Sequence, residues 1–345
     1  MRIAVYEAEK WEEKIFQGLR AGHEIHFFQA PLTENNLQSM PEAEILSTFI
    51  YSDLSRKVLG RLGRLKCIVT RSTGFDHIDL EYCRSRGITV SNVPTYGDHT
   101  VAEHVFALLF SVSRRLCEAI DRTRKGDFSS GDLQGFDLRG KMLGVIGTGN
   151  IGRRVIEIAT GLGMKVLAFD VHPDLQLAGT LDFRYVNMDA LLALSDIITL
   201  HVPANEKTHH LLSRDEFQQM KEGVILINTA RGSVVDHQAL ARALADGKVA
   251  AAGLDVLPDE PLIQEEAELL RSFYQKTHDL EQLLTGHTLL HMRNVLITPH
   301  IAFNTREAVE RILETSVENI ESFVSGNPQN VVVGPEAQGE KIPCS

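Results

Sequence analysis

Lys141-Met142-Leu143-Gly144-Val145-Ile146-Gly147-Thr148-Gly149-Asn150-Ile151-Gly152 is the stretch around which the rest of the chain is organised. A short apolar run that ends at Ile146 is typical of a buried strand, and the residues after Gly152 have the periodicity of a helix. The three glycines keep the G-x-G-x-x-G spacing of a dinucleotide-binding turn. Gly147 would permit the tight turn, Gly149 would let a pyrophosphate approach the backbone, and Gly152 would let the helix pack on the strand.

A second expected strand, residues 165–170, ends in Asp170 at the distance where an NAD ribose needs a hydroxyl acceptor. The same carboxylate would repel a 2′-phosphate, which favours NADH over NADPH, and His172 would soften this preference if it turned inward. The alternative is a glycine-rich turn in an α/β domain that binds nothing. With strand, helix and terminal acid in register, the sequence predicts NAD as the cofactor.

Length and composition set broad limits. At 345 residues, the chain is long enough for two domains. Its formal net charge of −11 argues against nucleic acid or an anionic membrane as a partner. We expect no membrane helix and no signal peptide, because apolar runs are short and the chain starts directly with a strand pattern. The four scattered cysteines predict a cytoplasmic protein with reduced thiols, three of them in the core.

Strand and helix patterns alternate along the whole chain, which predicts an α/β fold. Expected strands of a first parallel sheet are residues 2–6, 23–28, 44–49, 67–71 and 88–93. Those of a second sheet are 142–146, 165–170, 183–186, 197–202, 224–229, 251–256 and 295–298. One helix is expected from Thr100 to about Thr123, capped by Asp98 or Thr100, and a long one over 304–325. Residues 330–333 form a short apolar segment.

Three polar side chains follow strands of the second sheet. An arginine, Arg231, suits a carboxylate, while Asp255 and His300 supply an acid and a titratable imidazole. Together they are what a polarised carbonyl and its proton donor require, although each alone fits a surface or turn residue. In the first sheet, the loop Ser72-Thr73-Gly74 follows a strand and either binds a carboxylate through backbone N–H groups or is an ordinary loop. His104 is interpreted as a structural partner.

These motifs together resemble the NAD-dependent D-isomer-specific 2-hydroxyacid dehydrogenase family, and within it D-lactate dehydrogenases. The resemblance covers nearly the whole chain. Its motifs are residues 71–79, 101–104, 143–152, 201–203, 228–232, 255–256, 259–261 and 299–303.

The resemblance implies a role for each residue at a motif position. Arg231 would bind the substrate carboxylate and carbonyl, His300 would be the acid/base, and Glu260 would pair with His300 and favour its protonated form. Asp255 would hold the nicotinamide carboxamide. The substrate site would comprise Ser72, Thr73, Gly74, Tyr96, Arg231, His300 and Phe303. The cofactor site would comprise Gly147, Thr148, Gly149, Asn150, Ile151, Gly152, Asp170, His201, Val202, Pro203, Thr208, Thr229, Ala230, Arg231, Asp255 and His300.

The family also implies an architecture of two doubly wound parallel-sheet domains. A Rossmann NAD-binding domain, residues 99–301, would be inserted in a flavodoxin-like substrate domain made of 1–98 and 302–345. A homodimer through the NAD-binding domain is expected. Two features depart from the family: the stretch between Pro261 and Asn294 is long, and Tyr96-Gly97-Asp98-His99 leaves the preferred acid open.

The implied reaction is reversible reduction of a small 2-oxo acid, such as pyruvate, by NADH to the D-2-hydroxy acid. One rival is a formate or phosphite dehydrogenase, although formate enzymes of this family carry glutamine where Glu260 stands. Another is a non-enzymatic NAD-sensing binding protein. The chain is acidic and shows no obvious added docking segment, which argues against this rival. No metal site is expected, because His287 and His291 lack the glutamate of a zinc-protease motif.

Overall fold

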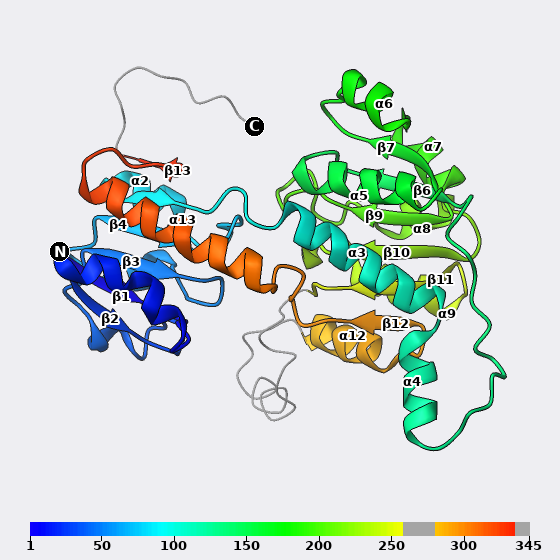
Figure 1. Cartoon of the computed structure of the whole chain (residues 1–345), viewed down its shortest axis with the longest axis horizontal. Helices are drawn as coiled ribbons and strands as arrows, with labels where there is room; N and C mark the ends of the chain where they lie inside the picture. The colour runs from blue at the N-terminus through cyan, green and yellow to red at the C-terminus, as the bar shows by residue number, and fades with distance from the viewer. Residues whose placement is uncertain (258–279, 335–345) are drawn as a thin grey trace. The chain divides into compact units, whose positions relative to one another are not determined.

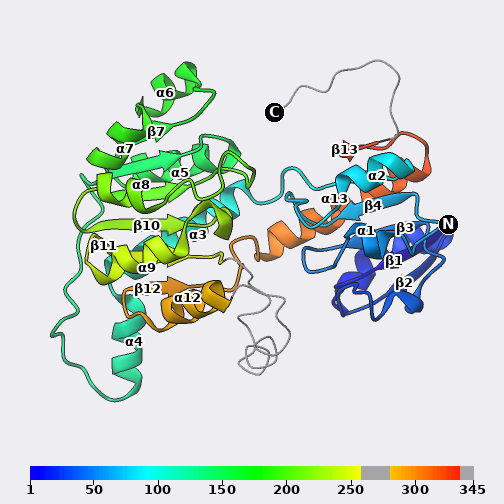
Figure 2. The same ribbon diagram turned by 180° about the vertical axis from the view of Figure 1, so that it is seen from behind.

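The computed structural model describes residues 1–257 and 280–334 (Figures 1 and 2). The chain divides into two compact units. The first comprises Met1–Tyr96 and Thr305–Ser345, and the second comprises Gly97–Asn304. Glu260 and most of the long stretch between Pro261 and Asn294 lie outside the described residues.

The first unit is built on a six-stranded sheet with the order β13-β5-β4-β3-β1-β2. Its strands are β1 (Arg2–Val5), β2 (Glu24–Phe27), β3 (Ile45–Thr48), β4 (Cys67–Thr70), β5 (Thr89–Ser91) and β13 (Val331–Val333). All neighbours pair in parallel except β13, which runs antiparallel to β5. The sequence predicted only an apolar segment there, because three residues give too short a period to identify a strand.

Alternation along the strands gives this sheet two apolar faces, since successive side chains of a strand point to opposite sides. Ile3 and Val5 face one core together with the 3₁₀ helix Glu12–Ala21 and α13 (Arg306–Val324). Ala4 faces the other core, near α1 (Arg56–Leu59) and α2 (Leu80–Arg86). Helices therefore cover both faces, as the predicted doubly wound fold requires.

The second unit is built on a seven-stranded sheet in which all neighbours are parallel, with the order β12-β11-β10-β9-β6-β7-β8. Its strands are β6 (Met142–Ile146), β7 (Lys165–Phe169), β8 (Arg184–Tyr185), β9 (Ile197–Leu200), β10 (Val224–Asn228), β11 (Val249–Leu254) and β12 (Val295–Ile297). The strand order reverses between β6 and β9. In such sheets ligands bind at the carboxyl ends of the strands beside this reversal.

Helices pack on both faces of this sheet (Figure 1). One face is covered by α3 (Asp98–Ser113) and α5 (Asn150–Gly161). The other carries α7 (Met188–Leu194), α8 (Arg214–Gln219), α9 (His237–Ala245) and α12 (Leu280–His291). The short helix α6 (Leu175–Leu181) lies between β7 and β8. None of the helices in the described part of the chain is long and apolar enough to cross a membrane.

The single helix expected from Thr100 to Thr123 is wrong, because the chain breaks it into α3 and α4 (Leu116–Arg124). The carbonyl of Ser113 accepts a hydrogen bond from the amide of Phe136, 3.0 Å away, in place of the next helical amide. Arg115 then adopts a left-handed conformation with φ +49°. The expected caps are also wrong, since Gly97 is the N-cap and no side chain caps α3.

The cysteine prediction needs one correction. Cys67 and Cys83 are buried, but Cys117 is exposed on α4 because that helix buries none of its residues.

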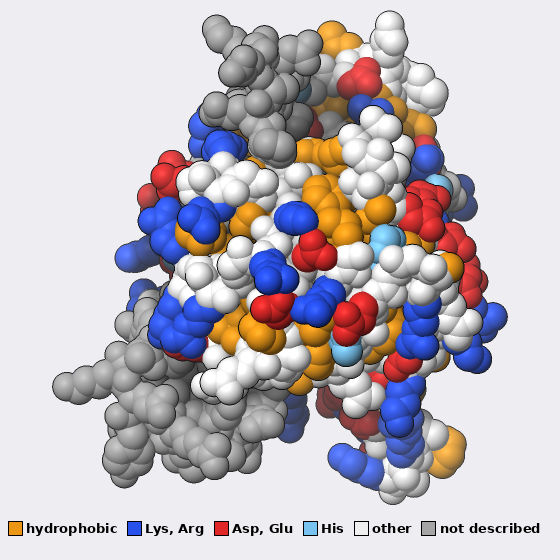
Figure 3. Space-filling view, turned by 90° about the vertical axis from the view of Figure 1, so that its left-hand side faces the viewer, with side chains coloured by type: hydrophobic (Ala, Val, Ile, Leu, Met, Phe, Trp, Pro, Cys, Tyr) orange, Lys and Arg blue, Asp and Glu red, His pale blue; other side chains and the backbone are white. Residues whose placement is uncertain are grey.

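On the face of the molecule shown in Figure 3, basic and acidic side chains are interspersed. In the first unit, for example, Arg2 pairs with Glu24 and Glu42, at 3.2 and 3.0 Å.

Candidate functional site

The glycine turn joins β6 to α5 with backbone packing that leaves no room for side chains at two of its three glycines. A Cβ at Gly147, where φ is +93°, would lie 2.4 Å from the His201 carbonyl oxygen. A Cβ at Gly152 would lie 2.0 Å from the Gly147 oxygen. At Gly149 nothing lies within 4 Å of that position. The turn is therefore closed on the protein side and open at Gly149.

The start of α5 adds positive potential to this open surface. No side chain caps the helix, whose N-cap is Gly149, and the exposed Asn150 and half-buried Ile151 follow in its first turn. Uncapped first-turn amides and the helix dipole favour an anion at this position. The turn thus fits the pyrophosphate of a dinucleotide.

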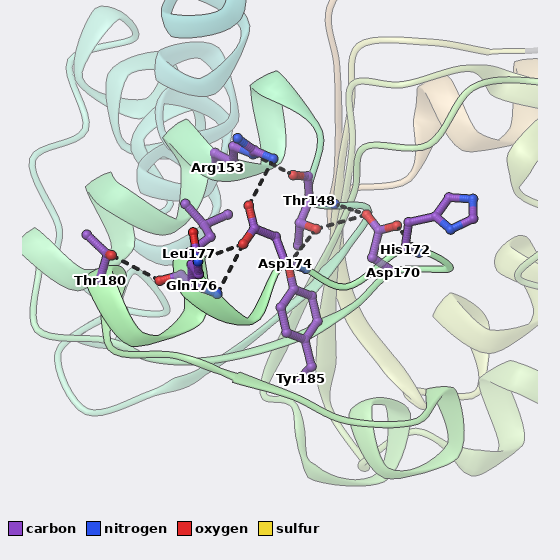
Figure 4. A network of polar contacts seen from close by, with 9 residues as sticks. All are labelled: Thr148, Arg153, Asp170, His172, Asp174, Gln176, Leu177, Thr180 and Tyr185. Carbon is purple, nitrogen blue, oxygen red and sulfur yellow. Dashed lines mark hydrogen bonds and ion pairs between the residues drawn. The ribbon is translucent and has the colours of Figure 1, made fainter. Parts of the chain in front are cut away.

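Asp170 follows β7 beside the turn (Figure 4). Its carboxylate accepts hydrogen bonds from the amide and hydroxyl of Thr148, at 2.7 and 2.9 Å, and from the amide of His172 at 2.9 Å. Burial opposes its charge, but the hydrogen bonds from His172 and Thr148 outweigh it and lower the pKa of Asp170. The carboxylate is therefore ionised at neutral pH. The imidazole of His172 is exposed and points away from Thr148.

The loop after β9 borders the turn on its other side. Burial lowers the pKa of His201 to about 3, and its Nε2 lies 2.9 Å from the Thr199 hydroxyl, so this imidazole is neutral at physiological pH. Val202 lies against the Gly147 backbone. Further along, the Thr208 hydroxyl donates to the Pro203 carbonyl at 2.5 Å, which closes the loop on itself.

The turn after β10 is held by a residue to which the sequence assigned no role. The buried Asn228 amide accepts from the Ala230 backbone at 2.9 Å and donates to the Arg231 carbonyl at 3.0 Å. The half-buried Arg231 guanidinium donates to the Ala230 carbonyl at 2.8 Å. Beside them, the buried hydroxyl of Thr229 has no hydrogen-bond partner within the described part of the chain. An orphaned polar atom at this edge fits a polar ligand that completes its bonding.

Asp255, at the end of β11, anchors the loop that carries His300. Its fully buried carboxylate accepts from the Thr298 hydroxyl at 2.5 Å, the Ile301 amide at 3.0 Å and the Ala302 amide at 2.8 Å. The His300 amide donates to the Asp255 carbonyl at 3.0 Å, and His300 is held at φ +52°. This left-handed conformation is uncommon outside glycine and is imposed here by the surrounding bonds.

His104 on α3 completes the anchor. Its Nε2 lies 3.1 Å from the Thr298 hydroxyl and 3.3 Å from Asp255 Oδ1. Burial raises the pKa of Asp255, but the bonds from His104, Thr298 and the two amides outweigh it and lower that pKa overall. An ionised Asp255 only accepts, so Thr298 donates its one proton to it and His104 donates to Thr298 or Asp255. His104 thus has the structural contact expected of it.

In the first unit, the loop after β4 is fixed by its own side chains. The Ser72 hydroxyl donates to the Gly74 carbonyl at 2.5 Å, and the Thr73 hydroxyl donates to the Val93 carbonyl at 2.8 Å. Asn92 donates to the Thr73 carbonyl at 2.8 Å. The loop is therefore rigid, and recognition of a carboxylate would fall to its main-chain amides.

The base of this loop depends on Arg71, whose role the sequence did not indicate. Its buried guanidinium donates to the carbonyls of Tyr6 and Glu7, at 2.8 and 2.6 Å, and so ties β4 to the end of β1.

The two expected aromatic pocket residues lie in different units. Tyr96 is half-buried in the first, with its carbonyl accepting from Arg311 at 2.8 Å, and Phe303 is half-buried in the second, just after His300.

In the second unit, three residues predicted for the active site therefore lie at the ends of three neighbouring strands. Arg231 follows β10, Asp255 follows β11 and His300 follows β12, and parallel strands bring these ends to one edge. The cofactor turn follows β6 at the same edge. Glu260 lies outside the described residues.

Comparison with known proteins gives consistent matches over most of the chain. The family model for the NAD-binding domain of D-isomer specific 2-hydroxyacid dehydrogenases matches residues 106–302. The D-lactate dehydrogenase of Escherichia coli K12 is 37% identical over 330 residues, covering 94% of this chain and 98% of that protein. The glyoxylate reductase of Thermococcus litoralis is 33% identical over 335 residues, covering 95% and 90%.

A solved structure is similar over the same extent. The D-lactate dehydrogenase of Aquifex aeolicus, in complex with NAD and lactic acid, superposes with a TM-score of 0.86 at 37% identity. The match covers 97% of this chain and 100% of that one.

Proposed function

The chain belongs to the D-isomer specific 2-hydroxyacid dehydrogenase family and is an NAD-dependent oxidoreductase, and we propose that its substrate is pyruvate, which it reduces to D-lactate. Members of this family act on small 2-oxo and 2-hydroxy acids. The observation that supports reduction of a 2-oxo acid is the edge of the second sheet, where Arg231 and the carboxylate-anchored loop of His300 follow neighbouring strands. The choice of pyruvate is supported by the similarity to D-lactate dehydrogenases over nearly the whole chain.

In this mechanism the bound cofactor supplies the hydride. Arg231 binds the substrate carboxylate and polarises the carbonyl that receives negative charge, which suits a planar cation. His300, starting as an imidazolium, donates its Nε2 or Nδ1 proton to the carbonyl oxygen as that oxygen becomes an alkoxide. Asp255 keeps the loop of His300 in place through the Ile301 and Ala302 amides. Glu260 would favour the charged form of His300.

The residues that would hold the cofactor follow from the geometry of the turn. The backbone at Gly149 and the start of α5 would bind the pyrophosphate. Asp170 would accept from the adenosine ribose and disfavour a 2′-phosphate, so NADH is preferred to NADPH. By the family resemblance, Asp255 would hold the nicotinamide carboxamide, and its fully buried carboxylate also anchors the loop of His300.

Relatives of this chain are named for different acids, among them glyoxylate reductase and glycerate dehydrogenase. The test is therefore steady-state reduction by NADH of a panel that contains pyruvate, glyoxylate and hydroxypyruvate, with formate and phosphite as hydride donors to NAD. We expect the largest kcat/KM with pyruvate and D-lactate as the product. A larger kcat/KM with another 2-oxo acid would replace pyruvate, and absence of turnover with NADH binding intact would favour the NAD-sensing alternative.

The two units would be the substrate-binding and NAD-binding domains of this enzyme. We also propose a homodimer through the NAD-binding domain. In that unit α4 and the segment after it expose Leu116, Ile120 and Phe128, which are 42%, 48% and 81% exposed. Light scattering should give twice the mass of one chain, and the double variant Ile120→Asp, Phe128→Asp should give a lower mass.

The free thiols of Cys67, Cys83 and Cys117 support a cytoplasmic location.

A further inference from the structure

A closed network of polar contacts surrounds Thr148 in the glycine turn (Figure 4). Thr148 is buried, and its amide and hydroxyl both reach Asp170 Oδ2. Its carbonyl accepts from Arg153 Nε at 3.1 Å. Tyr185, on the edge strand β8, brings its hydroxyl within 2.8 Å of the Thr148 hydroxyl. Tyr185, which α5, β7 and α6 separate from the turn in the chain, is thus bonded to the residue that holds Asp170.

The direction of every hydrogen bond in this chain of contacts is fixed by its two ends. At one end an ionised Asp170 only accepts, so the single proton of the Thr148 hydroxyl points to it. Tyr185 must then donate to Thr148. At the other end, the amide of Asp174 donates to the Tyr185 oxygen at 3.2 Å. The bonds run in one direction, from Asp174 to Asp170, and each strengthens the next.

The network leaves a limited acceptor capacity on Asp170. A carboxylate has about four lone-pair positions. Thr148 occupies both positions of Oδ2, and the His172 amide occupies one of Oδ1. One position on Oδ1 is therefore left for a ribose hydroxyl. Its direction depends on the orientation of the carboxylate, which Thr148 and Tyr185 determine.

We propose that Tyr185 is a positioning residue for cofactor selection: through Thr148 it holds Asp170 in the orientation that accepts the 2′-hydroxyl of NADH and repels the 2′-phosphate of NADPH. The inference rests on the preference for NADH proposed above. The ring of Tyr185 is held independently of its hydroxyl, because the ring of Phe183 packs against it edge-on, with centroids 5.0 Å apart. Tyr185→Phe therefore removes one oxygen from a ring that stays in place.

The test measures cofactor binding by calorimetry without any 2-oxo acid. NADH, NADPH and an NADH analogue that lacks the 2′-hydroxyl of the adenosine ribose are titrated into the parent and Tyr185→Phe proteins. We expect Tyr185→Phe to weaken NADH binding by about three- to tenfold, the effect of one hydrogen bond, and to leave the deoxy analogue unchanged. The preference for NADH over NADPH should fall by a similar factor. At saturating NADH, kcat should be unchanged.

Controls separate positioning from general damage. Tyr82→Phe, in the first unit, removes the same atom from another tyrosine and should change none of the ratios. Thr148→Ser keeps the hydroxyl and should keep the preference for NADH over the deoxy analogue, whereas Thr148→Val should lose it. If Tyr185→Phe does not fold, this pair still tests the link from Tyr185 through Thr148 to Asp170, and an unchanged preference in Thr148→Val would overturn the proposal.

The proposal is overturned if Tyr185→Phe weakens NADH and the deoxy analogue equally, or weakens neither. The binding readout does not depend on the substrate, so a failure to reduce pyruvate would leave this test intact.

Discussion

Asp255→Asn tests how the loop of His300 is held in place. In the parent, Asp255 Oδ1 accepts from the Thr298 hydroxyl and the Ile301 amide, and Oδ2 accepts from the Ala302 amide. Asparagine has one acceptor oxygen and one NH₂ donor. If its oxygen replaces Oδ1, its NH₂ faces the Ala302 amide, and two donors meet in the protein interior.

The cost follows from these bonds. A buried donor left without an acceptor costs about 1–3 kcal/mol, and the bonds that remain lose the strength that the charge gave them. We therefore expect Asp255→Asn to lower the free energy of unfolding by about 2–4 kcal/mol. We also expect Asp255→Asn to lower kcat by about 10²-fold, because a displacement of His300 by about 1 Å is enough for a loss of that size.

The assay combines denaturant unfolding with steady-state reduction of pyruvate. Asp196→Asn is the matched control, because Asp196 also accepts from a backbone amide, that of Met142 at 2.8 Å, but precedes β9 at the opposite edge of the same sheet. It should lose stability and keep kcat. If Asp255→Asn unfolds more easily but keeps kcat within about threefold, the bonds of Asp255 do not position His300.

Three further predictions concern the pocket and the titrating groups. Phe303→Ala and Tyr96→Ala should each raise kcat/KM for larger 2-oxo acids relative to pyruvate, by about tenfold, and unchanged preference in both would place the pocket elsewhere. Glu260→Gln should make reduction of pyruvate fail at lower pH than in the parent, because His300 loses the charge that favours its imidazolium; superimposable pH profiles would refute the pairing. Burial lowers the pKa of His237 to about 4 from 6.5, so the unfolded chain binds a proton that the folded chain does not, and stability falls as pH drops from about 6.5 to 4. Denaturant unfolding at pH 7 and pH 4 measures this loss, and His237→Gln should reduce the difference in free energy of unfolding between the two pH values by about 3 kcal/mol. The same difference in the parent and in His237→Gln would contradict this prediction.

The features that the sequence predicted well are local in the chain. Apolar runs locate strands such as β6 and β10 within one or two residues, because burial on both faces of a parallel sheet makes a strand continuously apolar. The glycine turn was recognised from its G-x-G-x-x-G spacing, within which Gly152 packs against the carbonyl of Gly147. The contact of Gly147 with His201, which follows β9, is not local and could not be read from that spacing.

The features that the sequence did not reveal depend on partners far away in the chain. The break after α3 needs Phe136, which takes the carbonyl of Ser113. Arg71 binds carbonyls of residues near the N-terminus, and any residue supplies a carbonyl, so no side-chain pattern marks the pair. Asp255 was assigned to the cofactor by the family resemblance, but its bonds to the loop of His300 are to backbone amides, which leave no trace in the sequence.

We propose that His300 supplies the proton for reduction of a 2-oxo acid at the edge of the second sheet. The most direct measurement is pyruvate reduction by NADH, across pH, in the parent and His300→Ala proteins, with the NADH dissociation constant measured for both. We expect His300→Ala to lose most of its turnover at every pH while it binds NADH nearly as the parent does. Turnover within about tenfold of the parent, with NADH binding intact, would contradict it, since general acid catalysis contributes about 10²–10⁴.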